Sequence, residues 1–129
     1  NIQSKFIRGL RVTDEKIINI VENVLIEFNK DIVDSLKEKN TEAIPIHTKK
    51  NSVIEVSAES KELGFVGKPD KINNDIIKHV IEKKMVPIIS PLGLKGNQTY
   101  NINGDTAAGA IAQSLKARRL ILMTNIVID

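Results

Sequence analysis

Helical and strand-like segments alternate along the second half of the chain, and this alternation restricts the fold more than any other feature. Apolar residues at helical spacing from Ile76 to Ile81 precede a strand-like run over 85–90. A helix rich in small residues over 105–117 precedes a second strand-like run over 120–128. Because such alternation favours a sheet covered by helices, we predict an α/β fold: a three-layer α/β/α sandwich with a mainly parallel sheet.

The first half opens with a helical pattern. Thr13 stands at the expected N-cap, and Asp14 and Glu15 place negative charge in the first turn. Apolar residues then recur at helical spacing as far as Phe28, and a second helical stretch is expected to end near 39–40.

Short apolar and glycine-bracketed runs lie between the helical segments. Strands are expected over 43–46 and 53–56, and residues 64–67 are expected to form a strand of a small inserted β-hairpin. Residues 91–96 read as a loop because they contain one proline and two glycines, and 99–102 as a further short strand.

Composition excludes several classes of protein. The 129 residues contain no cysteine, so a disulfide scaffold and cysteine metal sites are ruled out. The net charge is +3, with basic residues scattered in small pairs and aromatics at 3%, which argues against a nucleic-acid partner. No run of 18 apolar residues occurs, so we expect no membrane association and a cytoplasmic location.

Arg11 is the first candidate binding residue. It stands just before the expected helix, where a guanidinium can hold a carboxylate through two parallel hydrogen bonds beside the positive helix end. The alternative is that Arg11 pairs with a surface acid.

A polar cluster at 101–105 is the second candidate. Asn101 and Asn103 share one side of an extended stretch because side chains alternate along a strand, and Asp105 follows at the helix start. Two amides and a carboxylate after a strand suit a ligand rim in an open α/β sheet. The alternative is an ordinary loop in which Asp105 is the N-cap.

Four other residues are weaker candidates. His47 and His79 are solitary and lack metal-ligand spacing, so we predict no metal site. Met85 and Met123 lie in apolar runs and are predicted to be core residues.

Several motifs together resemble acetylglutamate kinase, a member of the amino-acid kinase family. The most specific are GLRVTDEKIINIVENVL, beginning at Gly9, and YNINGDTAAGAIAQSLKA, beginning at Tyr100. NKDIV, LGFVGKPDKIN, VPIISPLG and LILMTN occur in the same order, so the resemblance covers essentially the whole chain.

The resemblance implies transfer of the ATP γ-phosphoryl group to the side-chain carboxylate of N-acetyl-L-glutamate, a step of arginine biosynthesis, with Mg²⁺ accompanying ATP. It implies that Arg11 binds the α-carboxylate, that Asn101 and Asn103 contact the acetylglutamate, and that Asp105 orients catalytic lysines. Thr124 and Asn125 would lie at the nucleotide. The first helix, beginning near Thr13, would form a homodimer.

The same resemblance implies that the chain is a partial domain. Residues 1–129 would hold most of the acetylglutamate-binding and dimerisation lobe and the start of the ATP lobe. The Lys-x-Gly-Gly loop and a second lysine typical of the family are not found, so this chain alone is expected to be inactive. Alternatives are a non-catalytic dimerisation module and a kinase for aspartate, glutamate, carbamate or a nucleotide.

Overall fold

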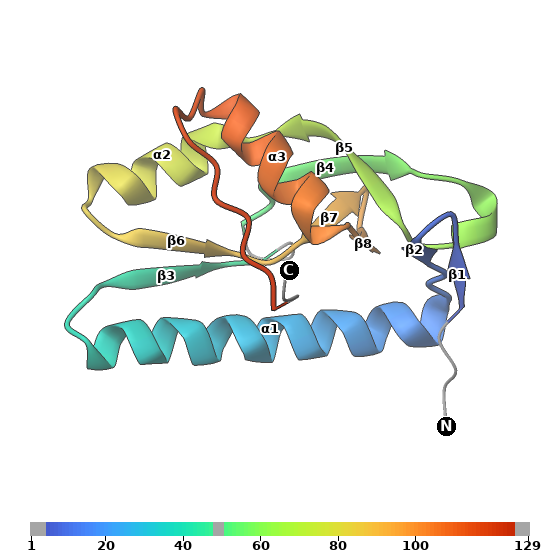
Figure 1. Ribbon diagram of the computed structural model, residues 1–129, viewed down its shortest axis with the longest axis horizontal. Helices are drawn as coiled ribbons and strands as arrows, with labels where there is room; N and C mark the ends of the chain where they lie inside the picture. The colour runs from blue at the N-terminus through green and yellow to red at the C-terminus, as the bar shows by residue number, and fades with distance from the viewer. Residues whose placement is uncertain (1–4, 48–50, 126–129) are drawn as a thin grey trace.

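The computed structural model describes residues 5–47 and 51–125. Its elements follow the chain in this order (Figure 1): β1 (Phe6–Ile7), β2 (Leu10–Arg11), α1 (Glu15–Glu38), β3 (Ala43–Ile46), β4 (Ile54–Ala58), the 3-10 turn η1 (Lys61–Leu63), β5 (Gly67–Ile72), α2 (Asn74–Glu82), β6 (Val86–Ile89), β7 (Leu92–Lys95), β8 (Gln98–Asn101) and α3 (Gly104–Ser114).

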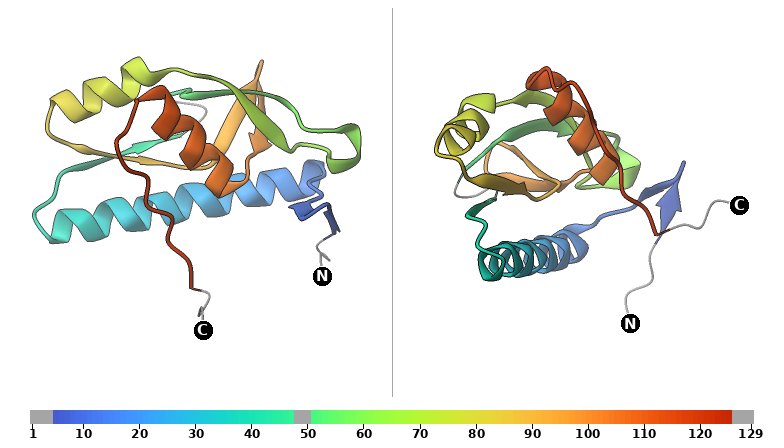
Figure 2. Two further views of the ribbon diagram at one scale, coloured as in Figure 1. Left: turned by 45° about the horizontal axis from the view of Figure 1, so that its top comes forward. Right: turned by 60° about the vertical axis from the view of Figure 1, so that its left-hand side comes forward.

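The elements form three layers. The long helix α1 lies along one face of the strands, where it contacts β3, β6 and β8. The other face carries α2, which contacts β6, and α3, which contacts β5. Both views in Figure 2 show the strands between α1 on one side and α2 with α3 on the other. The predicted α/β class is confirmed.

The strands pair in both directions. The parallel pairs are β3 with β6 and β4 with β7, while β4–β5 and β7–β8 are antiparallel hairpins. The larger sheet has four strands in the order β5-β4-β7-β8, and β1 pairs with β2 in a separate ribbon. Parallel pairing is therefore present, but antiparallel hairpins contribute more of the described sheet than the sequence pattern indicated.

A proline lies within β3 without disrupting it. Pro45 faces Ile88 in the parallel ladder, and the amides of Val86 and Ser90 donate to carbonyls on either side of it. The alternation of this ladder turns the backbone nitrogen of Pro45 away from β6, so its missing N–H costs no hydrogen bond there. The strand predicted at 43–46 is confirmed.

Helix α1 begins one residue later than its sequence suggested. Asp14 is the N-cap, and its carboxylate accepts a hydrogen bond of 2.9 Å from the backbone amide of Ile17. Thr13 is wholly buried, and its backbone pairs with Leu63 and Phe65 in the connection between β4 and β5. The predicted N-cap at Thr13 was wrong because both backbone groups of Thr13 form strand-like hydrogen bonds with this connection.

Helix α1 is also one continuous helix of 24 residues rather than two. Asn29, which follows Phe28, lies on its buried face and donates hydrogen bonds of 2.7 Å to the carbonyl of Ile88 and 3.0 Å to the hydroxyl of Ser90. The polar residue therefore anchors the helix to the sheet. The helix ends where Asn40 adopts a positive φ of 61°, a conformation that asparagine tolerates.

The main core lies between the larger sheet and the helices α2 and α3. Its buried members come from both layers and include Ile54, Val56, Ile77, Ile102 and Ala107. The small side chain of Ala107 lets α3 approach the strands closely. Met85 is half-buried and packs against this core, as predicted.

Two segments differ from the predicted strands and loops. Residues 92–95 form strand β7, and the loop prediction failed because Gly93 serves close packing: a Cβ there would collide with the side chain of Val56. Gly64 and Val66 make isolated bridges, and the hairpin strand begins at Gly67.

The segment after α3 has no regular structure as far as Asn125. The strand predicted over 120–128 was wrong for its described part, since no described strand pairs with it; residues 126–129 lie outside the described residues. Met123 is 93% exposed, so the predicted core position was also wrong. In Figure 1 this segment crosses the molecule in front of the strands towards α1.

Candidate substrate-binding site

A pocket of about 340 Å³ lies between the start of α1 and the ends of the central strands. Its polar members are Arg11, at the end of β2, and Asn101, at the end of β8. The remaining wall is apolar, and its residues are Ile20, Val21, Val24, Leu25 and Pro91. The structure thus brings together two of the residues singled out from the sequence.

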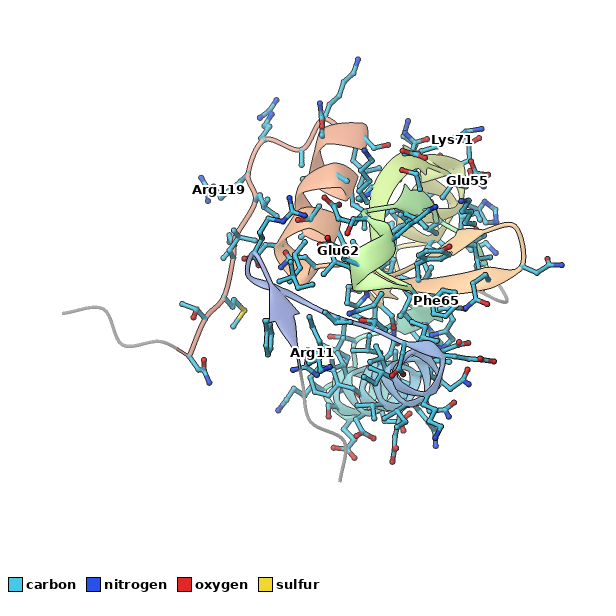
Figure 3. The ribbon with its side chains drawn as sticks, turned by 90° about the vertical axis from the view of Figure 1, so that its right-hand side faces the viewer. Arg11, Glu55, Glu62, Phe65, Lys71 and Arg119 are labelled. Atoms are coloured by element: carbon cyan, nitrogen blue, oxygen red, sulfur yellow. The ribbon has the colours of Figure 1, made fainter. Side chains whose placement is uncertain are left out.

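Arg11 has no acidic partner among the described residues. Its guanidinium carbon lies 5.5 Å from the ring centroid of Phe6, across the β1–β2 ribbon. The ion pair found in this region joins Arg8 to Glu62 at 3.7 Å. The alternative that Arg11 pairs with a surface acid is therefore not supported, and its charge remains available for an anionic ligand. Figure 3, which looks along α1, places Arg11 beside the near end of this helix.

Asn101 is held by its backbone. Its amide donates a 2.8 Å hydrogen bond to the carbonyl of Phe65, and it faces Leu92 in the β7–β8 ladder. These contacts leave its side chain at the pocket wall, and no hydrogen bond from that side chain is found among the described residues. An amide in this position can both donate to and accept from a ligand.

The pocket combines one positive charge, one amide and an aliphatic wall. A cavity of this size suits a small molecule, and its chemistry suits a carboxylate carried on a short aliphatic chain. Arg11 would hold the carboxylate, and α1 would cover methylene and methyl groups. Periodicity revealed the apolar residues of α1, but it did not reveal which of them line the pocket, because several stripes on this helix are apolar.

The polar residues Asn103 and Asp105 at the start of α3 have different surroundings. Asn103 is the N-cap, and its side-chain oxygen accepts hydrogen bonds of 3.1 Å and 3.3 Å from the amide and hydroxyl of Thr106. Asp105 is exposed in the first turn. The alternative that Asp105 is the N-cap was wrong, and neither Asn103 nor Asp105 lines the pocket that holds Arg11.

A second hollow of about 400 Å³ runs along α3 and β6. It shares Pro91 with the first pocket, includes Gly104 and Ala108 of α3, and is closed on one side by Leu120. Thr124 and Asn125, predicted at the nucleotide, are exposed and lie beyond the residues that line this hollow.

The remaining candidates lie elsewhere. His79 is exposed on α2, and His47 is half-buried just after β3. Within the described ranges, no three histidine, cysteine, aspartate or glutamate side chains come together in a way that could hold a metal ion. None of the described helices is long and apolar enough to cross a membrane.

Comparison with known protein families identifies the family of this chain. The chain belongs to the amino acid kinase family, whose model matches residues 1–127. Its relatives include the acetylglutamate kinase of Pelagibacter ubique (strain HTCC1062), which is 55% identical over 127 residues, 98% of this chain and 44% of the relative. The acetylglutamate kinase of Ruegeria sp. (strain TM1040) is 42% identical over 97% of this chain and 44% of its own length. The chain thus spans less than half of these curated relatives.

Solved structures share the fold of this chain. The protein smu.665 from Streptococcus mutans UA159 superposes with a TM-score of 0.91 and 31% identity, covering 97% of this chain and 52% of that protein. N-acetylglutamate synthase from Neisseria gonorrhoeae, solved with coenzyme A and N-acetyl-glutamate, matches at a TM-score of 0.76 and 19% identity over 89% of this chain and 27% of its own. At that identity the second likeness shows the fold alone.

Proposed function

We propose that this chain forms the acetylglutamate-binding part of an acetylglutamate kinase, an enzyme that transfers the γ-phosphoryl group of ATP to the side-chain carboxylate of N-acetyl-L-glutamate. One observation carries the proposal: Arg11 and Asn101 line the same pocket, whose remaining wall is aliphatic. The 55% identity to a protein named acetylglutamate kinase supports it.

Each candidate residue has one role in the proposal. Arg11 binds the α-carboxylate of the substrate through charge-assisted hydrogen bonds. Asn101 holds the acetylglutamate by its side-chain amide, whereas Asn103 lies outside this pocket and caps α3. Asp105 orients lysines that neutralise the transferring phosphoryl group, and Thr124 and Asn125 border the nucleotide. Phosphoryl transfer depends on such positioning and on charge neutralisation.

Mg²⁺ would arrive with the nucleotide. No cluster of three candidate ligands occurs among the described residues, and Mg²⁺ in kinases is held largely by the substrate phosphates. We therefore assign it no step that involves this chain.

A dimer is part of the same proposal. Ile20, Val24 and Phe28 are 47%, 57% and 61% exposed and follow one another at intervals of one helical turn on α1. Such a stripe suits an isologous contact between two copies of the helix.

The proposed function can be tested in a chimera. Residues 1–127 of this chain would replace the matching segment of the Pelagibacter ubique acetylglutamate kinase, with the unaltered relative as the control. We expect ADP release that requires both ATP and N-acetyl-L-glutamate. L-Aspartate, L-glutamate, carbamate and a nucleoside monophosphate should not replace the acceptor.

Two results would contradict the proposal. A folded chimera that phosphorylates one of those other acceptors in preference would assign the chain to a different kinase. A folded, dimeric chimera that releases no ADP would favour the non-catalytic module.

A further inference from the structure

The two polar residues of the pocket are connected through the short segment Gly64–Val66, which joins η1 to β5. One end of the connection is Thr13, two residues after Arg11. The amide of Thr13 donates a 2.8 Å hydrogen bond to the carbonyl of Leu63, and the carbonyl of Thr13 accepts a 2.8 Å hydrogen bond from the amide of Phe65. Thr13 and Gly64 therefore form a parallel bridge.

The other end of the connection is Asn101. The carbonyl of Phe65 accepts a 2.8 Å hydrogen bond from the amide of Asn101, and Val66 forms a parallel bridge with the same residue. The backbone of Phe65 thus joins the two sides: its amide donates to Thr13, close to Arg11, and its carbonyl accepts from Asn101. Its ring packs edge-on against the ring of Tyr100, with 5.5 Å between the ring centroids, which fixes the segment further.

Thr13 links this connection to Arg11 itself. Its side chain is wholly buried, and its hydroxyl donates a 3.2 Å hydrogen bond to the carbonyl of Arg11. The backbone position of Arg11 is therefore set by a residue that is itself held on both sides by the Leu63–Phe65 backbone.

Gly64 makes the close approach possible. Its φ is +70°, and a Cβ at this position would collide with the carbonyl oxygen of Thr13. A side chain here would be strained and would also push Thr13, and with it Arg11, away from Phe65 and Asn101.

We propose that Gly64–Val66 is a positioning segment that sets the separation of Arg11 and Asn101, and that Gly64 is the residue on which this spacing depends. The proposal deepens the function proposed above, since the spacing matters for the acceptor substrate. Misplacing a binding group by about 1 Å costs on the order of 100-fold in rate, so small shifts of Thr13 are enough.

The first test compares Gly64→Ala with Gly96→Ala in the chimera. Gly96 has a similar φ of +60° but nothing within 4 Å of an added Cβ. An alanine there has the same kind of backbone strain as an alanine at position 64 but collides with no other residue. We expect Gly64→Ala to raise KM for N-acetyl-L-glutamate by about tenfold or more, with KM for ATP unchanged. Gly96→Ala should leave both constants unchanged. Equal effects of the two variants on a functional chimera would overturn the proposal.

A second pair of variants covers the case in which Gly64→Ala does not fold. Thr13→Val keeps the shape of the side chain and removes the hydroxyl, whereas Thr13→Ser keeps the hydroxyl and removes a methyl group. A positioning role predicts that Thr13→Val raises KM for N-acetyl-L-glutamate severalfold and that Thr13→Ser does not. A purely structural role predicts that both variants keep the original KM, and that Thr13→Ser lowers the free energy of unfolding because the serine leaves a cavity.

A third experiment measures hydrogen exchange and requires no enzymatic activity. Amide hydrogen exchange in this chain itself should show protected amides at Thr13, Phe65 and Asn101. Gly64→Ala should lose that protection, while Gly96→Ala should keep it. Fast exchange at these amides in the unaltered chain would contradict the inference. A chimera that ignores N-acetyl-L-glutamate while the exchange pattern holds would instead contradict the proposed function.

Discussion

Arg11 and Asp105 carry charges with different surroundings, and the proposed function gives them different roles. Arg11 faces a pocket whose wall is aliphatic, beside the ring of Phe6. Asp105 lies exposed in the first turn of α3, outside that pocket. A residue on the pocket wall affects binding of the acceptor in the ground state, while an acid that orients other groups matters most in the transition state.

Replacing Asp105 by asparagine should therefore reduce turnover more than binding. We expect Asp105→Asn in the chimera to lower kcat by about 100-fold and to leave both KM values nearly unchanged. Asp75→Asn is the matched control, because Asp75 is likewise the acid in the first turn of its helix, α2. Steady-state kinetics decides the matter, and an equal loss of kcat in both variants would remove Asp105 from the reaction.

Sequence motifs located the polar groups of the site better than its walls. Arg11 and Asn101 were singled out as a cation before a helix and an amide near the end of a strand, and the family motifs around them suggested their roles. Asn101 and Asn103 could not be told apart, since backbone conformation alone makes the second an N-cap. The role of Gly64 was missed because its collision partner, Thr13, is distant in the sequence.

Among the elements, α1 takes part in packing, in the wall of the candidate pocket and in the exposed apolar surface. One stripe packs on β3, β6 and β8, and a second lines the candidate pocket. The exposed apolar stripe shares Ile20 and Val24 with the pocket wall and extends beyond it to Phe28. Its existence followed from apolar periodicity, but its continuity did not, because Asn29 looks like a break and is in fact a buried anchor to the sheet. Similarly, glycine in β7 resembled a loop residue and proved to serve close packing against Val56.

The N-cap of α1 is a testable consequence at this scale. Asp14→Ala removes the acceptor for the amide of Ile17 and should lower the free energy of unfolding by about 0.5–2 kcal/mol. Asn73→Ala is the control, since Asn73 is the N-cap of α2 without a side-chain capping bond. Urea unfolding of this chain measures both; an equal or larger loss for Asn73→Ala would show that the cap of Asp14 contributes nothing.

For the molecule as a whole, the corner between β6 and β7 separates two hollows. Pro91 lines the candidate acceptor pocket on the α1 side and also the hollow along α3. The three-layer arrangement therefore places the candidate acceptor site and the start of α3 on either side of one turn. Along α1 an exposed apolar stripe runs from Ile20 and Val24 at the mouth of this pocket to Phe28 outside it.

Self-association is the expected consequence of that stripe. Phe28 lies on it but outside the pocket, so Phe28→Glu should convert a dimer of this chain into a monomer without altering the acceptor site. Asn19→Glu adds the same charge at an exposed position on another side of α1 and should leave the dimer intact. Analytical ultracentrifugation would oppose the prediction if the unaltered chain remained monomeric at high micromolar concentration.

The most direct test of the central claim is the effect of Arg11→Ala on the two Michaelis constants of the chimera. Loss of a charge-assisted contact costs about 1.5–3 kcal/mol, so KM for N-acetyl-L-glutamate should rise about 10- to 150-fold while KM for ATP stays the same. Arg8→Ala removes a neighbouring arginine whose exposed ion pair with Glu62 lies outside the pocket, and it should change neither constant. A rise in KM for ATP without a rise for N-acetyl-L-glutamate would contradict the assignment of this pocket to the acceptor.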